Sequence, residues 1–283
     1  MLELRRDQAS GLRRLFRKAP VTRIAFAGGA PRGDGTELAL ACARALRSQG
    51  FGLMLIDERS GPGNALGRLR QRPRYDLIQA LERSLPLPRV CLPVGPSLMV
   101  AAASRLAARG HELDSGMRQA LAECMRAFDE ACDVMIIDMA TEATTASMGC
   151  SALAREADHV VVTVRDQSRS MTESYALIKQ ICTWGEVPDV HVVVAGPMSP
   201  TAAHALYGRF AETVGAYLGV RPLWGGHMGP DVEASTSRAD RAASQVAYAL
   251  AEKIVVARYE KPVAARSGTN RWLESTRSMA SCS

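Results

Sequence analysis

The feature that most constrains the fold is an alternation of short apolar runs with helical patterns, which continues from residue 20 to residue 256. The strand-length runs are Thr22–Ala27, Gly52–Asp57, Arg89–Val94, Asp133–Asp138, His159–Val164 and Val190–Ala195. The segments with helical periodicity are Thr36–Gln49, Tyr75–Arg83, Gly116–Ala131, Met171–Thr183, Thr201–Leu218 and Arg238–Tyr259. Runs rich in Val, Ile and Leu at consecutive positions are typical of central parallel strands that helices cover on both faces. The alternation predicts a doubly wound α/β fold with a mostly parallel sheet.

The two ends of the chain differ from this pattern. Residues 1–19 form a candidate helix that Pro20 separates from the first strand, and 20–259 is expected to be a single α/β domain. Residues 260–283 are polar and rich in Ser and Arg, which predicts a disordered tail. An open alternative is a weak membrane-facing stripe of Trp272, Leu273 and Met279, which requires the tail to be helical.

Composition excludes several classes of protein. The 283 residues are 47% apolar, but no apolar run approaches the roughly 20 residues that span a bilayer. No secretory signal follows the charged N-terminus. The seven Cys are dispersed, none forms a C-x-x-C pair, and the five His show no metal-ligand spacing. These features favour a cytoplasmic protein with reduced thiols over a disulfide scaffold or a zinc site.

The charge balance limits the partners without identifying one. The net charge is +6, and arginines near both ends of the chain supply much of it. This charge favours an acidic protein, an anionic lipid surface or weak association with nucleic acid. Only 5% of the residues are aromatic and none is interleaved with a basic cluster, so direct nucleic-acid binding is not expected.

The leader segment has the pattern of a short amphipathic helix. Asp7 can cap its start, and Leu12, Leu15 and Phe16 fall on one face at helical spacing, with basic residues around them. Such a helix is suited to a groove on a partner protein. The alternative is a basic helix that packs on its own domain or frays in water.

The loop after the first strand has the position of a phosphate-binding loop. Gly29-Ala30-Pro31-Arg32-Gly33-Asp34-Gly35-Thr36 connects this strand to the first helix of the domain. A phosphate loop needs backbone N–H groups, a lysine that reaches the terminal phosphates and a hydroxyl for magnesium. Here proline removes a donor, and Asp34 adds a negative charge where phosphate oxygens would lie. A glycine-rich turn is also an ordinary structural feature of α/β folds.

Two further strands end in carboxylates. Leu53–Asp57 leads into Asp57-Glu58-Arg59-Ser60-Gly61-Pro62-Gly63-Asn64, and Val134–Asp138 ends in a second aspartate. One such strand is weak evidence, because a terminal Asp often caps the following helix. Several elements in the order of one family are stronger evidence.

Taken together, these elements resemble the MinD/ParA family of deviant P-loop ATPases. The family loop reads Gly-Lys-Gly-Gly-x-Gly-Lys-Thr, so its two lysines fall on Ala30 and Gly35, while Gly29 and Thr36 match. The stretch 57–64 resembles Asp-x-Asp-x-Gly-x-x-Asn, with Arg59 replacing the Asp that positions the attacking water. The strand ending in Asp138 resembles Walker B, where the Asp holds magnesium through water, and residues 157–179 resemble the next strand and helix of the family.

The resemblance implies a vestigial nucleotide site. Its binding positions would be Gly29, Arg32, Gly33, Gly35 and Thr36, with Arg32 as the only nearby cation. Asp57 and Asp138 would be vestigial catalytic positions, and Thr36 and Asp138 would hold magnesium only if ATP binds. We therefore expect no cofactor, or ATP-Mg if the site still works, and a pseudo-ATPase is favoured over an enzyme.

The leader resembles the Asp-Gln-Ala-x-x-Leu-Arg element at the start of the FlhG/FleN family, MinD-type regulators of flagellar number. The resemblance implies a helix that docks on the flagellar GTPase FlhF and stimulates GTP hydrolysis, with Gln8 near the reacting phosphate. Asp7, Ala9, Leu12 and Arg13 would support the contact. A glutamine can orient an attacking water, and a supplied arginine can stabilise transition-state charge.

The family also implies further partners and a location. Flagellar C-ring proteins and an enhancer-binding activator would bind the α/β domain, and a homodimer and peripheral contact with the inner membrane or cell pole remain open. The alternatives are an active MinD/ParA-type ATPase that uses Arg32 and Thr36, and a MinD-like scaffold in another envelope or partition system.

Overall fold

The computed structural model describes residues 20–28, 34–61, 63–110, 113–140, 150–229 and 236–256. The leader, most of the phosphate-loop segment and the tail therefore lie outside the described residues. The predictions for Asp7, Gln8, Ala9, Leu12, Arg13, Gly29, Arg32 and Gly33 fall on these parts.

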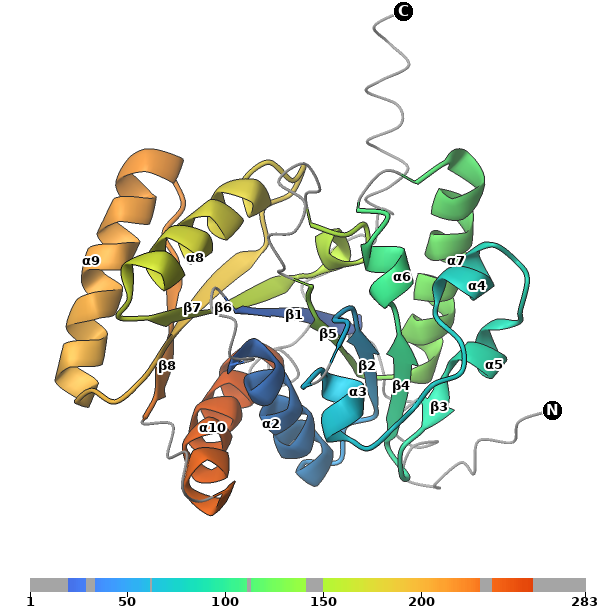
Figure 1. The fold of residues 1–283 in the computed structure, drawn as a ribbon, viewed down its shortest axis with the longest axis horizontal. Helices are drawn as coiled ribbons and strands as arrows, with labels where there is room; N and C mark the ends of the chain where they lie inside the picture. The colour runs from blue at the N-terminus through green and yellow to red at the C-terminus, as the bar shows by residue number, and fades with distance from the viewer. Residues whose placement is uncertain are drawn as a thin grey trace, which may run out of the picture.

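The described chain forms a single eight-stranded sheet, and the predicted fold class is confirmed (Figure 1). The strands in chain order are β1 (Thr22–Gly28), β2 (Leu53–Asp57), β3 (Leu92–Pro93), β4 (Leu98–Ala102), β5 (Val134–Asp138), β6 (His159–Arg165), β7 (Asp189–Ala195) and β8 (Leu223–Met228). Their order across the sheet is β3-β4-β2-β5-β1-β6-β7-β8. All neighbours run parallel except β3, which pairs antiparallel with β4 at the edge.

Helices cover both faces of the sheet. They are α2 (Asp34–Ser48), α3 (Ala65–Arg68), α4 (Ile78–Leu81), α5 (Leu87–Val90), α6 (Ser104–Ala107), α7 (Ser115–Ala131), α8 (Ser168–Ile181), α9 (Pro200–Leu218) and α10 (Thr236–Ala251), with a 3-10 turn η1 (Ala154–Glu156) and a π turn η2 (Glu252–Val256). One apolar core lies between the sheet and α2, α3 and α10, and the other lies between the sheet and α4, α7, α8 and α9. Both faces of the central strands are therefore buried, which explains their near-continuous apolar sequence.

The ends of α7 and α9 have the caps that their sequence explains, whereas the helix expected at Arg238–Tyr259 is α10, which ends at Ala251 and continues as a π turn to Val256. Asp114 caps α7 by accepting a hydrogen bond from the Met117 N–H at 2.8 Å. Ser199 caps α9, Pro200 occupies its first turn, and Gly219 ends it with a left-handed φ of 70°. Proline at the start and glycine just past the end are favoured because neither position continues the backbone hydrogen-bond ladder.

The predictions were wrong around residues 75–102. The expected parallel strand Arg89–Val94 is instead the short helix α5 followed by the two-residue antiparallel strand β3. The strand that pairs in parallel with β2 on the outer side is β4, which was not predicted. The expected helix Tyr75–Arg83 is reduced to α4. Outside this region, the edge strand β8 was also not predicted.

Candidate functional site

The candidate site lies where the carboxyl ends of the central strands meet. In the sheet β2, β5, β1 and β6 are consecutive neighbours, and α2 follows β1 after the loop. Asp57 and Asp138 end adjacent strands and are register partners. Ligands of open α/β folds bind at this edge, where the chain order of the strands reverses.

Thr36 and Asp138 are in direct contact, as the resemblance implies for a magnesium-binding pair. The Thr36 hydroxyl lies 2.8 Å and 3.1 Å from the two carboxylate oxygens of Asp138, and both residues are fully buried. Burial, together with the nearby charge of Asp57, raises the pKa of Asp138 to about 7, although the Thr36 hydrogen bond opposes the rise. The predicted pair therefore forms around a carboxyl that resists ionisation.

The second aspartate is held by the backbone. Asp57 accepts hydrogen bonds from the Arg59 N–H at 3.0 Å and the Leu66 N–H at 2.8 Å. Burial raises its pKa above the ordinary range, although these hydrogen bonds oppose the rise. Asp57 thus fixes the segment that leads from β2 to α3.

A third buried carboxyl, Glu58, was not predicted, because it occupies an open position of the family pattern. Ser151 donates a hydroxyl hydrogen bond to Glu58, and the Ala140 N–H donates another at 3.3 Å. Glu58 is 2% exposed, and burial raises its pKa to about 7. It thereby connects the residues on either side of segment 141–149, which lies outside the described residues.

The phosphate-loop helix begins with a buried ion pair. Nε of Arg165 lies 2.6 Å from Oδ2 of Asp34, and a terminal nitrogen of Arg165 lies 2.7 Å from Oδ1. Asp34 is 3% exposed and Arg165 is 7% exposed. The prediction that Arg32 is the only nearby cation was wrong, since Arg165 at the end of β6 reaches the first turn of α2 from 131 residues away in sequence. No local motif marks Arg165, because the contact depends on how β1 and β6 pair.

Gly35, which occupies the position of the second family lysine, lies against β1. A Cβ atom at this position would lie 3.0 Å from the Ala27 carbonyl carbon and 3.1 Å from the Gly28 nitrogen. These distances are shorter than ordinary van der Waals contacts, and both neighbours are backbone atoms. A side chain at position 35 would therefore require α2 or β1 to shift by a few tenths of an ångström.

These residues do not fit a magnesium-bound triphosphate. Thr36 and Asp138 retain the chemistry for the metal. The Asp34 carboxylate, however, is paired with the guanidinium of Arg165, and position 35, where the family has its second lysine, is a glycine packed tightly against β1. The raised pKa values of Asp57, Glu58 and Asp138 indicate a site that does not favour additional negative charge.

Two residues of the 57–64 pattern have structural roles. Asn64 caps α3 by accepting a hydrogen bond from the Gly67 N–H at 2.8 Å, and its amide donates to the Arg59 carbonyl at 3.2 Å. Cap hydrogen bonds of this kind satisfy backbone donors at a helix start. The match to the family stretch is therefore explained in part by the turn from β2 into α3.

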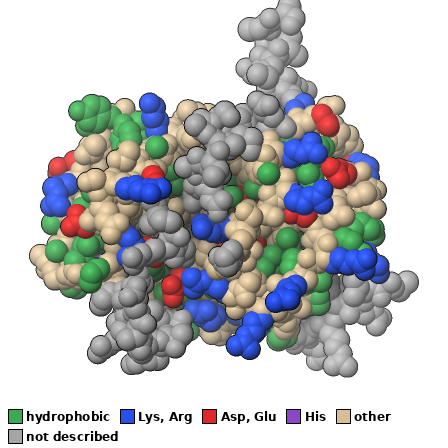
Figure 2. Space-filling view, in the orientation of Figure 1, with side chains coloured by type: hydrophobic (Ala, Val, Ile, Leu, Met, Phe, Trp, Pro, Cys, Tyr) green, Lys and Arg blue, Asp and Glu red, His purple; other side chains and the backbone are tan. Residues whose placement is uncertain are grey.

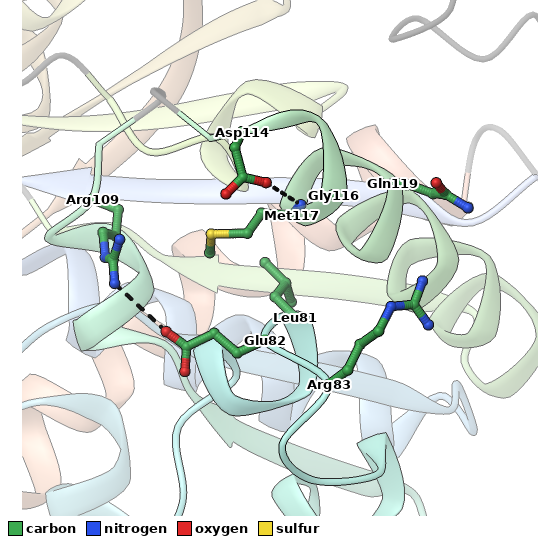
Figure 3. A pocket seen from close by; sticks show the side chains of 8 residues that line it. All are labelled: Leu81, Glu82, Arg83, Arg109, Asp114, Gly116, Met117 and Gln119. Carbon is green, nitrogen blue, oxygen red and sulfur yellow. Dashed lines mark hydrogen bonds and ion pairs between the residues drawn. The ribbon is translucent and has the colours of Figure 1, made fainter.

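A separate hollow of about 450 Å³ lies beside α4 and the start of α7 (Figure 3). Its lining residues are Leu81, Glu82, Arg83, Arg109, Asp114, Gly116, Met117 and Gln119. Arg109 pairs with Glu82 at 3.5 Å and Arg83 pairs with Glu123 at 3.0 Å. None of the predicted site residues lines it.

On the face drawn in Figure 2, the described basic side chains do not form a single concentrated patch. Figure 2 shows Lys and Arg side chains spread across the viewed face rather than gathered in a single stripe. Within the described ranges, no group of three or more His, Cys, Asp or Glu could hold a metal ion. Over the same residues, no helix has both the length and the apolar character needed to cross a bilayer.

Comparisons with known proteins show similarity to one curated protein and to several solved structures. No family model matches the chain. It is 28% identical over 205 residues to the antiactivator FleN of Pseudomonas aeruginosa, a match that covers 71% of each chain. The MinC:MinD cell division protein complex of Aquifex aeolicus has the same fold, with a TM-score of 0.61, 18% identity, and coverage of 88% of this chain and 100% of that chain. The chain is therefore similar to a FleN antiactivator over most of its length, and it has the fold of MinD.

A third similar structure carries a nucleotide. Cobyrinic acid a,c-diamide synthase of Mycobacterium smegmatis, solved with an ATP analogue and magnesium, has a TM-score of 0.56 and 14% identity, covering 82% of this chain and 95% of that one. At this identity the likeness concerns the fold alone. Ala30 and Gly35 stand in this chain where the MinD/ParA loop pattern has its two lysines.

Proposed function

We propose that this protein is a FleN-type regulator of flagellar number and placement that acts by binding protein partners. The observation that carries the proposal is its relationship to the antiactivator FleN over 71% of both chains. The leader motif around Gln8 supports stimulation of an FlhF-type GTPase as one of its activities. The relative's name supports an enhancer-binding activator as a further partner.

We further propose that the α/β domain acts without a nucleotide switch. The support is the buried contact of Asp34 with Arg165 and the close approach of Gly35 to β1. The first feature places a carboxylate at the start of α2, and the second disfavours a lysine at position 35, where the family pattern has one. The domain then serves as a fixed scaffold that carries the leader and the partner surfaces.

The first test is GTP turnover by the cognate FlhF-type GTPase, measured with the full-length protein and with its Gln8→Ala variant. We expect the wild type to raise turnover and Gln8→Ala to lose most of the increase, because the glutamine would orient the attacking water. A matched control is Ser10→Ala, a position that the leader pattern leaves open, and it should stimulate like the wild type. Equal stimulation by both variants, or none by the wild type, contradicts the role of Gln8.

An active ATPase is the second candidate, and the direct Thr36–Asp138 contact is the observation in its favour. Steady ATP hydrolysis by the wild type that is lost in Thr36→Ala would establish it. Such a result would remove the scaffold proposal but leave the GTPase test independent.

A further inference from the structure

The buried ion pair of Asp34 and Arg165 stands where α2 begins and β6 ends, at the carboxyl edge of the sheet. We propose that Asp34 is a built-in anion, whose carboxylate fills a site for a phosphate-type oxyanion formed by Arg165 and the first turn of α2. The inference rests on the proposed nucleotide independence and deepens it, because it names the group that keeps the site closed.

The geometry of the pair is that of oxyanion recognition. Two nitrogens of Arg165 meet the two oxygens of Asp34 at 2.6 and 2.7 Å, as a guanidinium fork meets a carboxylate or phosphate. The carboxylate also lies in the first turn of a 15-residue helix, where the backbone N–H groups favour negative charge. Guanidinium and helix start thus both favour an anion at this position, and Asp34 supplies it.

The Asp34 carboxylate is covalently part of the chain, so it stays at the site. A carboxylate attached to α2 has a high effective concentration at Arg165 and cannot diffuse away, so a free anion competes poorly. The pair is also buried, and removing one partner of a buried ion pair is destabilising, because the remaining charge loses that bidentate contact. Deleting the carboxylate should therefore create both instability and a site that an external anion can fill.

The resemblance provides a variant that vacates the site. Asp34 falls on a glycine of the family loop, so Asp34→Gly removes the carboxylate and leaves space beside Arg165. Asp34→Asn is the matched control, because it removes the charge but keeps the site filled with an amide of the same shape. The double variant Asp34→Gly/Arg165→Met removes both charges and with them the proposed oxyanion site.

The experiment measures Tm for the full-length wild type and the three variants in millimolar inorganic phosphate, in ATP-Mg, and in chloride of equal ionic strength. In chloride we expect Asp34→Gly and Asp34→Asn to melt roughly 10 °C below the wild type. A free anion at about ten times its Kd should raise the Tm of Asp34→Gly by roughly 3–5 °C more than that of the wild type. Asp34→Asn and the double variant should not share this gain.

The outcomes distinguish a free phosphate from a nucleotide as the source of the anion, and they decide whether the proposal holds. A gain with phosphate alone supports a site for a single phosphate-sized anion, and a gain with ATP-Mg alone supports a phosphoryl group of a nucleotide. If Asp34→Gly gains no more than Asp34→Asn in either solution, the built-in anion is overturned. If Asp34→Gly does not fold in chloride, the same comparison is made on refolding yield with and without phosphate. ATP binding by the wild type would instead overturn the proposed nucleotide independence, so the two failures are distinguishable.

Discussion

At the scale of single residues, close contacts around the site determine what it can bind, and the presence of the family's motif residues is not sufficient. Thr36, Asp57 and Asp138 come together as the family pattern implies. The features that count against the family chemistry are the pairing of Asp34 with the Arg165 guanidinium and the tight packing of Gly35 against β1. Two residue-scale predictions follow from this packing and from the buried Glu58.

The first concerns Gly35→Ala. Alanine usually stabilises a helix by up to about 1 kcal/mol relative to glycine. Here the added methyl group meets the β1 backbone, so we expect a loss of about 1 kcal/mol or more. Urea unfolding measures the change, and Gly35→Lys should lose at least as much rather than restore ATP binding.

Gly208→Ala is the control for this substitution. Gly208 lies inside α9, and a Cβ built there has nothing within 4 Å, so alanine should stabilise the protein. A stabilising Gly35→Ala would mean that α2 can move away from β1 at little cost.

The second prediction concerns the pH dependence that Glu58 gives to stability. Its pKa is about 7 in the folded protein against an ordinary value of 4.5, so between these values the folded state binds more protons than the unfolded state. Its contribution is therefore fully present below about pH 4.5 and is lost as pH rises toward 7. We expect the free energy of unfolding of the wild type to fall by up to about 3 kcal/mol between pH 4.5 and 7.5 because of Glu58, and we expect Glu58→Gln to remove this fall.

The measurement is the urea-unfolding free energy of wild type and variant at several pH values. The amide that Glu58→Gln introduces keeps an acceptor for the Ala140 N–H and adds a donor toward Ser151, so the variant should fold. Glu123→Gln removes a more exposed carboxylate that pairs with Arg83, and it should keep the wild-type dependence. Parallel pH curves for wild type and Glu58→Gln would show that Glu58 ionises at its ordinary pKa in the folded protein.

At the scale of elements, the long amphipathic helices and the strongly apolar central strands were predicted well, and the weakly patterned edge elements were not. Helices α2, α7, α8 and α9 lie within a few residues of their predicted ranges, because an amphipathic pattern over many residues has one structural solution. The strand predicted at Arg89–Val94 was wrong because Pro86 and Pro88 favour the start of a short helix, α5. β4 and β8 were missed because their alanines and glycines have little strand signal, although neighbouring strands supply their hydrogen bonds.

At the scale of the whole molecule, the question is whether ATP controls assembly. In the family, ATP lies between two subunits and drives their association. Because the guanidinium of Arg165 is already paired with the carboxylate of Asp34, we expect millimolar ATP-Mg to change neither the sedimentation coefficient nor the Tm of this protein. A ligand at about 100 times its Kd would stabilise by about 2.7 kcal/mol, which is easily measured.

The control for that measurement is Asp34→Gly/Gly35→Lys compared with Asp34→Gly alone. If both variants fold and neither assembles with ATP-Mg, the rest of the loop also blocks the nucleotide. A dimer of the wild type that forms only with ATP-Mg would contradict nucleotide independence and favour the ATPase alternative.

The sequence by itself determined the fold class, because alternating apolar runs and helical patterns allow few arrangements other than helices on both faces of a parallel sheet. The resemblance to the MinD/ParA motifs also singled out Thr36, Asp57 and Asp138, which lie together in the structure at the carboxyl edge of the sheet. Only the tertiary structure brought Arg165 to Asp34, placed the β1 backbone against Gly35 and buried Glu58 beside Ser151. These contacts join residues far apart in the chain, and their geometry depends on strand pairing and helix packing, which no local pattern records.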